Sequence, residues 1–422
     1  MEIFSEKWKG DIKVKLALRE RLLVAKAEKA GERWLPLYIH LSDTAGVMDK
    51  LLSEYLADSF SDMCELSRDE LKKTALFLAY SHDIGKATAV FQSKIIKAVP
   101  FRKPQIEKYG VELPDFCEFH DYKETPHTLA GENILLFLGC PNEVAVVVES
   151  HHGIPTRKLD LDTLADDPAY AKNYFASIKE EKLWKDIWRN YYDFAMEKSG
   201  MKSFSEIPIL NRQAQMLFTG LLIMADWIAS NTEWFPLLSV NDWEDERGME
   251  TRIEEGWEAF QLTDVWCPVN EIYSETFFKQ TFLFPPRQIQ SDVLKIISSV
   301  NESGIYIVEA PMGCGKTEIA LAAAEILAAK FERTGLFFGL PTQATSNGIF
   351  PRVLEWAKKQ SDEMFQSIQL AHGSAMLNNT FMDIERGIPE VYDGDMDGEI
   401  VVHSWFCGKK QSCLADFVVL GK

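Results

Sequence analysis

Apolar residues recur at helical spacing through roughly the first 240 residues, with polar residues between them. The clearest run, residues 71–79, follows a capping-box pattern formed by Ser67 and Glu70. Because a glycine commonly lies just past the C-terminus of a helix, Gly85 is expected to stop this one. The first part of the chain is therefore predicted to be all-α.

Further helices are predicted in the same part of the chain from proline start signals and apolar periodicity. The segment Lys13–Ala30, which is rich in Leu, Ala, Lys and Glu, fits this helical pattern. The other predicted segments are one opening at 34–41, then 125–138, 143–152 and 210–230.

The pattern changes after residue 240. Acidic residues crowd the stretch from Asp242 to Glu255, and short apolar runs then alternate with a helical segment. We expect strands at Ile305–Val308 and Leu336–Leu340 and a helix at Glu318–Lys330, an alternation typical of a parallel sheet. The predicted organisation is multidomain: an all-α domain (1–240), an acidic connector (241–284) and an α/β lobe (285–422).

Composition limits the classes of protein to consider. The chain has 422 residues, 46% of them hydrophobic and 26% charged, as in ordinary globular proteins. It has no apolar run of about 18 residues and no signal-peptide pattern, so we expect a cytoplasmic protein with no membrane contact. The net charge of −19 repels nucleic acid on average, so any DNA contact would need a local basic groove.

Residues with metal-ligand chemistry collect in the helical part. The adjacent His82 and Asp83 lie at a predicted helix end, where the carboxylate has two oxygens that can bridge two ions. Asp226 lies on an apolar helical face, and a buried carboxylate is costly unless it is paired or ligates a cation. Taken singly, each residue could be an ordinary core or surface side chain. Together they supply enough ligands for two divalent ions: His40, His82, Asp83, His127, His151, His152 and Asp226.

Two divalent ions a few ångströms apart suit phosphodiester hydrolysis, because they can activate a water and stabilise charge on the phosphate. Imidazole-rich coordination favours transition metals over magnesium. Lys86 is either a contact to a phosphate oxygen or a surface lysine following a helix.

The order of these motifs resembles the HD nuclease domain of type I CRISPR effector nuclease–helicases. The His151-His152-Gly153 and Ala225–Asn231 stretches carry the resemblance more specifically than the His-Asp pair, which many phosphohydrolases share. The resemblance implies a metal-dependent nuclease for single-stranded DNA, with two ions (Mn, Ni, Co or Fe), Asp83 bridging them and Lys86 contacting phosphate. It implies one ligand set of His40, His82 and Asp226, and a second of His127, His151 and His152.

A second motif, residues 309–317, lies between a predicted strand and a predicted helix. Gly313 and Gly315 would let backbone amides turn toward phosphates, Lys316 would reach the β/γ oxygens, and Thr317 could ligate magnesium. The motif resembles the P-loop of superfamily 2 helicases, which implies a site for Mg-ATP.

Flanking segments also resemble these helicases. Gln290 matches the glutamine that reads adenine, and Thr342 and Gln343 match a strand-end motif that touches DNA. Segments 403–410 and 414–417 resemble the CRISPR family, its subtype E members especially.

Two parts of a working helicase are not found in the sequence. The carboxylate motif expected after a third strand is missing, since Asp362-Glu363 lies in a polar run, and no second RecA-like lobe follows. We therefore expect an incomplete first helicase lobe, weak nucleotide binding, and little ATP hydrolysis or unwinding by this polypeptide alone. A separate chain could supply the remainder.

By the resemblance, the complete protein would be recruited by an RNA-guided surveillance complex to degrade the displaced strand in antiviral defence. Two alternatives remain open at this point. One is an HD-type nucleotide phosphohydrolase that uses the same metals, and the other is a non-catalytic remnant that docks on the surveillance complex. The complete ligand set and the attached P-loop favour the nuclease.

Overall fold

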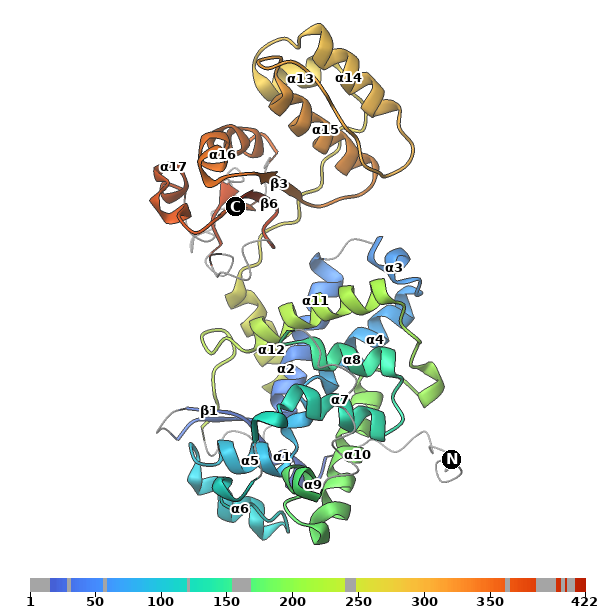
Figure 1. Ribbon diagram of the computed structural model, residues 1–422, viewed down its shortest axis with the longest axis vertical. Coiled ribbons are helices and arrows are strands. Elements are labelled where there is room, and N and C mark those ends of the chain that lie inside the picture. Colours follow the sequence, from blue (N-terminus) through green and yellow to red (C-terminus); the bar gives the residue numbers. More distant parts are fainter. Residues whose placement is uncertain are drawn as a thin grey trace. The chain divides into compact units, whose positions relative to one another are not determined.

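The computed structural model describes residues 16–28, 32–55, 59–119, 122–153, 168–239, 248–360, 365–384, 400–403, 407 and 414–422. The chain forms two compact units that divide between Phe260 and Gln261 (Figure 1). The expected connector 241–284 is therefore shared: helix α12 (Met249–Phe260) belongs to the first unit, and the residues from Gln261 onward belong to the second. Several features singled out in the sequence lie outside the described residues: 241–247, Asp362, Glu363, 404–406 and 408–410.

The first unit is predominantly helical, as predicted, and none of the described helices is long and apolar enough to cross a bilayer. Its other helices are α1 (Leu18–Arg21), α2 (Leu37–Lys50), α3 (Ser59–Cys64), α4 (Arg68–Ser81), α5 (Ala89–Ile95), α6 (Lys103–Lys108), α7 (His127–Phe137), α8 (Asn142–Ser150), α9 (Pro168–Phe175), α10 (Glu181–Lys198) and α11 (Arg212–Ala229).

Two helices show how the apolar pattern sets the packing. The predicted capping box is present at the start of α4, where Ser67 and Glu70 satisfy each other's backbone amides. On α11, Phe218, Leu222 and Asp226 are all buried, as their i, i+4, i+8 spacing predicted. Helices α2, α4 and α8 pack around α11, so the apolar faces of all four form one core.

The segment Lys13–Ala30 differs from the helical prediction. Its described part forms only the short helix α1, and the chain then enters strand β1 (Val24–Ala27), which pairs antiparallel with β2 (Trp34–Pro36). Both backbone groups of Val24 form hydrogen bonds with the Gln92 side chain. The Val24 N–H donates to the Gln92 side-chain oxygen at 3.0 Å, and the Val24 carbonyl accepts from the Gln92 side-chain nitrogen at 2.9 Å. These long-range contacts outweigh a weak local preference for helix.

The second unit contains the predicted parallel sheet, with strands β3 (Leu336–Leu340), β4 (Gln366–Ala371), β5 (Ile400–Val401) and β6 (Phe417–Gly421) in the order β3-β6-β4-β5. Its core includes Trp266, Trp356 and Phe417, whose rings meet edge to face. Its helices are α13 (Glu275–Phe282), α14 (Gln288–Ser299), α15 (Lys316–Lys330), α16 (Gln343–Ala357) and α17 (Asn379–Met382).

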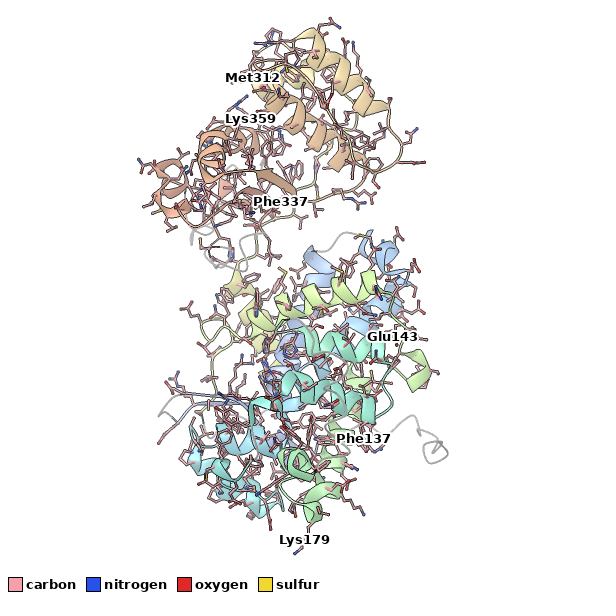
Figure 2. The ribbon with its side chains drawn as sticks, viewed as in Figure 1. Phe137, Glu143, Lys179, Met312, Phe337 and Lys359 are labelled. Atoms are coloured by element: carbon pink, nitrogen blue, oxygen red, sulfur yellow. The ribbon has the colours of Figure 1, made fainter. Side chains whose placement is uncertain are left out.

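The predicted strand at Ile305–Val308 does not form. The run has no ladder partner among the described residues, and Ile305 and Ile307 are 93% and 84% exposed. A short apolar run becomes a strand only where a neighbouring strand pairs with it. Strand β3, the next strand along the chain, pairs with β6 and not with residues 305–308. Met312 and Phe337 are exposed as well (Figure 2), so this unit presents several large apolar side chains to solvent.

Candidate functional site

The first unit brings all seven candidate metal ligands into one cluster. They come from α2, the end of α4, the first turn of α7, the end of α8 and the last turns of α11. Within each of two sets the ligand atoms lie within 4.8 Å of one another: His40, His82, Asp83 and Asp226 in one, and His127, His151 and His152 in the other.

The two oxygens of Asp83 face different histidines. Asp83 Oδ2 lies 2.9 Å from His40 Nε2 and 3.4 Å from His82 Nε2. Asp83 Oδ1 lies 3.4 Å from His127 Nε2 and 3.6 Å from His151 Nε2. The carboxylate therefore joins the two ligand sets, which is the geometry that a bridging ligand needs.

Asp226 completes the first set. Its Oδ1 atom lies 3.4 Å from His40 Nε2 and 3.6 Å from His82 Nε2, and it accepts a hydrogen bond of 2.8 Å from the Ser230 hydroxyl. Ser230 was not anticipated, although it lies four residues from Asp226 and such pairs share a helical face. This hydroxyl fixes the orientation of the carboxylate.

Close packing sets the position of Asp83 relative to α7. After α4 the chain makes a 3₁₀ turn, Ile84–Lys86, in which a Cβ on Gly85 would lie 1.9 Å from the backbone oxygen of His127. Gly85 does not adopt a left-handed φ, so its expected role as a helix stop is wrong. The residue is glycine because the turn approaches α7 too closely for any side chain.

Backbone carbonyls set the tautomers of two histidines. His82 Nδ1 lies 2.8 Å from the Ala79 oxygen, and His151 Nδ1 lies 2.5 Å from the Val148 oxygen. A carbonyl can only accept, so each Nδ1 carries a proton. Each Nε2 therefore faces the cluster and becomes a metal ligand when it carries no proton of its own.

Several polar atoms at the centre of the cluster are buried and, among the described residues, lack a hydrogen-bond partner. They are Nε2 of His40, His82, His127 and His151, and Oδ1 of Asp83. Leaving such an atom unsatisfied costs about 1–3 kcal/mol. Imidazole nitrogens and carboxylate oxygens are ligands of divalent transition metals, so these buried atoms fit a pair of such ions.

Electrostatics keep the carboxylates ionised. Burial alone would raise the pKa of Asp83, but the charges of Lys86 and His82 and the close approach of the His151 and His40 rings hold that pKa well below its usual range. Burial opposes ionisation of Asp226 too, yet His40 and His82 hold its pKa well below the usual range. Both groups are therefore available as anionic ligands at neutral pH.

The imidazoles behave differently from one another. Burial lowers the pKa of His127 to about 3, and burial together with the charge of His151 lowers the pKa of His152 to about 4, so both are neutral at pH 7. Burial also disfavours charge on His82, but Asp83 and Asp226 outweigh it and raise the pKa of His82 to about 9. A metal ion bound at His82 would take the place of that proton.

Lys86 is buried, at 7% exposure, and its Nζ lies 2.5 Å from Asp83 Oδ2. The lysine therefore lies inside the cluster instead of projecting from the surface.

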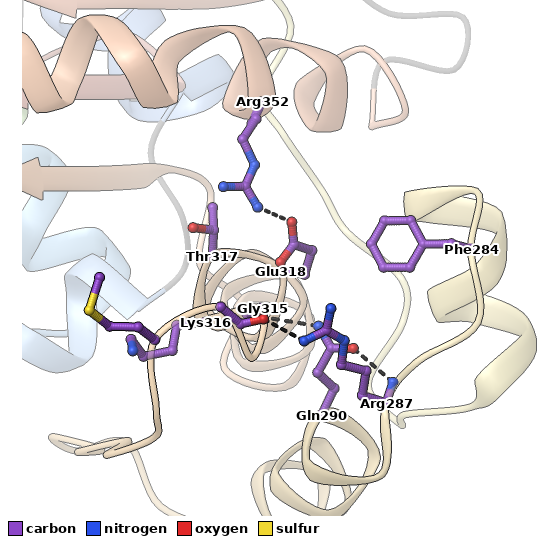
Figure 3. A pocket seen from close by; sticks show the side chains of 10 residues that line it. Phe284, Arg287, Gln290, Gly315, Lys316, Thr317, Glu318 and Arg352 are labelled. Atoms are coloured by element: carbon purple, nitrogen blue, oxygen red, sulfur yellow. Dashed lines mark hydrogen bonds and ion pairs between the residues drawn. The ribbon is translucent and has the colours of Figure 1, made fainter.

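In the second unit the predicted P-loop lies at a cavity of about 500 Å³ (Figure 3). Gly313 and Gly315 adopt left-handed φ values of 74° and 88°, and a Cβ on Gly315 would lie 2.2 Å from the side-chain nitrogen of Gln290. Lys316 and Thr317 begin helix α15, whose unpaired N–H groups and dipole favour an anion. All the predicted nucleotide-binding residues line this cavity, together with Phe284, Arg287, Met312, Glu318 and Arg352.

Hydrogen bonds hold the P-loop in shape. Lys316 Nζ donates to the backbone oxygens of Ala310 and Pro311 at 2.8 and 3.0 Å, and Gln290 donates to the Gly315 oxygen at 3.2 Å. Arg352 pairs with Glu318 across the cavity (Figure 3). No sequence pattern pointed to this arginine, since it lies 34 residues beyond its partner.

The two predicted DNA contacts lie where β3 leads into α16. Thr342 caps α16, accepting a hydrogen bond of 3.2 Å from the Thr345 amide, and Gln343 is the first residue of that helix.

Comparison with known proteins identifies the family of the chain. Residues 25–235 match the family described as "Cas3, HD domain". The chain is 37% identical over 404 residues to the CRISPR-associated nuclease/helicase Cas3 of Streptococcus thermophilus, and 27% identical over 419 residues to the CRISPR-associated endonuclease/helicase Cas3 of Thermus thermophilus. These alignments cover 92% and 95% of this chain but only 43% of each relative.

Among solved structures, T. fusca Cas3 with ATP matches over 94% of this chain and 43% of its own, with a TM-score of 0.67 and 21% identity, which shows a shared fold. The matched family region covers half of the chain and contains every residue of the two ligand sets. The chain belongs to the Cas3 HD-domain family.

Proposed function

We propose that the chain is a metal-dependent nuclease that hydrolyses phosphodiester bonds of single-stranded DNA in CRISPR interference. The observation that carries the proposal is Asp83, whose two oxygens face separate histidine sets. The names of the relatives as nuclease/helicases support the same activity.

Each described group has a proposed part in the reaction. His40, His82 and Asp226 would hold one divalent ion, His127, His151 and His152 would hold a second, and Asp83 would contribute to both sites. Two such ions supply Lewis acidity and water activation for phosphodiester hydrolysis. Ser230 fixes Asp226, and Lys86 steadies Asp83 and donates to a phosphate oxygen of the strand.

The remaining parts of the proposal concern functions beyond the metal cluster, and this chain spans 43% of the length of its matched relatives. We propose that an RNA-guided surveillance complex presents the displaced strand. The P-loop cavity binds Mg-ATP, with Lys316 and Thr317 at the phosphates and Gln290 beside the loop. Thr342 and Gln343 contact the DNA backbone.

The test is cleavage of circular single-stranded DNA with Mn²⁺, Ni²⁺ or Co²⁺ and without ATP. Wild type should cleave, Asp83→Ala should not, and Asp69→Ala, an exposed aspartate on α4, should match wild type. Failure of the metal-loaded wild type to cleave would refute the nuclease. Phosphate release from free nucleotides without DNA cleavage would instead support a phosphohydrolase.

A further inference from the structure

The metal cluster is open to solvent on the side of its second ligand set. The first ligand set is buried throughout, whereas in the second the side chain of His127 is 22% exposed and His152 is exposed. A polymer that is too large to enter the core must therefore approach the cluster at these two histidines. The side chains that border them are candidates for holding such a polymer.

Phe91 on α5 lies at this opening. Its ring meets that of His127 edge to face, with the two centroids 5.7 Å apart, and Lys86 Nζ lies 5.8 Å from the Phe91 centroid. Lys94 follows three residues later on α5, where residues share a helical face, and it is exposed. Helix α5 therefore leads from the metal cluster to an exposed cation.

Two aromatic rings and a second lysine continue from Lys94. Lys94 Nζ lies 5.2 Å from the ring centroid of Tyr122, which is 38% exposed. The centroids of Tyr122 and Phe116 are 4.7 Å apart, and Lys97 Nζ lies 4.8 Å from the Phe116 centroid. We call this series of contacts the lysine–aromatic strip, and its members are Phe91, Lys94, Tyr122, Phe116 and Lys97.

The lysines of the strip belong to a locally cationic stretch of an acidic chain. Residues 84–111 contain six lysines and arginines and one glutamate, a net charge of +5, whereas the whole chain carries −19. A chain that repels nucleic acid on average needs such a local excess of positive charge in order to bind a polyanion. The charge distribution therefore favours an anionic polymer at α5 over the rest of the surface.

The carboxylates beside the strip leave its cations accessible. Lys94 has no ion-pair partner in the part of the chain that the structure describes. Asp115 lies 4.0 Å from Lys97, and their side chains are 65% and 57% exposed. Exposed pairs at this separation are weak, because water and salt screen them. The neighbouring Glu118 pairs with Lys172 instead of with the strip.

Aromatic rings between the lysines favour a single-stranded nucleic acid among polyanions. Proteins that bind single strands combine cations along the backbone with aromatic side chains on which bases stack, and a duplex keeps its base faces covered. We propose that the lysine–aromatic strip binds the segment of single-stranded DNA next to the scissile phosphate, with Lys94 and Lys97 at phosphates and Tyr122 under a base. The choice of ligand rests on the proposed function, in which single-stranded DNA is the substrate.

The experiment measures binding by fluorescence anisotropy of a labelled oligodeoxythymidylate, in chelator so that the strand is not cleaved, over a series of salt concentrations. Linear inorganic polyphosphate of matched length is a competitor that has the charge but no bases. The variants are the double change Lys94→Gln with Lys97→Gln, and Tyr122→Leu with Tyr122→Phe as its conservative partner. Lys198→Gln is the matched control, since Lys198 is exposed and lies over the Phe194 ring on α10.

We expect the double lysine variant to bind both polymers about tenfold more weakly, and its slope of log affinity against log salt to fall by about 0.7 for each lysine. Tyr122→Leu should weaken binding of the oligonucleotide by about fivefold or more and leave polyphosphate binding unchanged. Tyr122→Phe and Lys198→Gln should match wild type. Wild-type affinity for the oligonucleotide in either the double variant or Tyr122→Leu would overturn the inference, and so would a wild type that does not bind it.

Failure of the proposed function is distinguishable from failure of this inference, because binding is measured without the metal that cleavage needs. A wild type that does not cleave DNA with Mn²⁺, but whose binding depends on the strip, would refute the nuclease and support the binding surface. Cleavage by wild type together with unchanged binding in the strip variants would support the nuclease and overturn the inference.

Discussion

Replacing Gly85 with alanine tests whether close packing sets the metal cluster. The added Cβ would lie 1.9 Å from the His127 oxygen and 2.5 Å from the Gly131 nitrogen, and both of these atoms are backbone. Real Cβ atoms essentially never come closer than 3.0 Å to another heavy atom, so α7 and the 84–86 turn must separate by about 1.1 Å, the difference between 3.0 and 1.9 Å.

That separation acts directly on the ligands, because Asp83 precedes the turn and His127 begins α7. Overpacking of this kind costs about 1–3 kcal/mol of stability, and a misplacement near 1 Å at a catalytic group costs about a hundredfold in rate. We therefore expect Gly85→Ala to weaken Mn²⁺ binding at the His127 set and to reduce DNA cleavage by about a hundredfold.

The assay combines calorimetric Mn²⁺ titration, thermal unfolding and cleavage of single-stranded DNA. Gly220→Ala is the matched control, since Gly220 lies exposed within α11 with nothing within 4 Å of an added Cβ. It should stabilise the helix by up to about 1 kcal/mol. If Gly85→Ala bound two Mn²⁺ ions with wild-type affinity, the packing argument would be refuted.

Three further predictions concern other parts of the chain. Arg252→Met should destabilise the first unit by about 3–5 kcal/mol, because it leaves the buried Asp43 carboxylate without the arginine that donates to it at 2.9 Å. An unchanged melting temperature would contradict this prediction. Burial raises the pKa of Asp416 to about 6 despite hydrogen bonds from Ser367, so the stability from this group is fully present below pH 3.8 and is lost as pH rises through 6. In the wild type, the free energy of unfolding should fall by about 3 kcal/mol over this pH range, and Asp416→Asn should abolish that fall. Hydrogen-exchange protection of β4, measured as a function of pH, reads out the change. An equal pH dependence in the variant would count against the reasoning. Lys316→Ala should weaken ATP binding by about tenfold or more in a fluorescent-nucleotide titration, and equal binding would show that the cavity is not the ATP site.

The sequence predicted those parts of the site whose chemistry is carried by residue type. Asp226 could be singled out because a carboxylate on an apolar helical face is costly to bury unless it is paired or binds a cation. His82 and Asp83 could be singled out because they are adjacent at a predicted helix end, where both side chains can ligate a metal. The order of the parallel sheet could not be predicted, because it depends on which strands find partners, and Ile305–Val308 found none among the described residues.

Residues that act through geometry were missed or misread. Gly85 seemed to be a helix stop because a glycine after a helix usually is one, and its contact with α7 exists only in three dimensions. Strand β1 was hidden inside a segment that looked helical, although its apolar run from Leu22 to Ala25 was compatible with a short buried strand. Gln92 carried no sequence signal, since its partners lie 68 and 6 residues away.

The wide spread of the ligands along the chain couples metal binding to folding. The cluster joins residues from His40 to Asp226, on five helices, so no partly folded form of this unit can offer the whole set. An ion that binds only the finished cluster stabilises the native state by about 2.7 kcal/mol when its free concentration is a hundred times the dissociation constant. Divalent metal in the growth medium should therefore increase the yield of destabilised variants, and the increase should be larger for variants that keep more of the seven metal-ligand side chains. Chelation should lower the melting temperature of the first unit. The metal-ligand cluster would then report complete folding, in addition to its proposed part in hydrolysis.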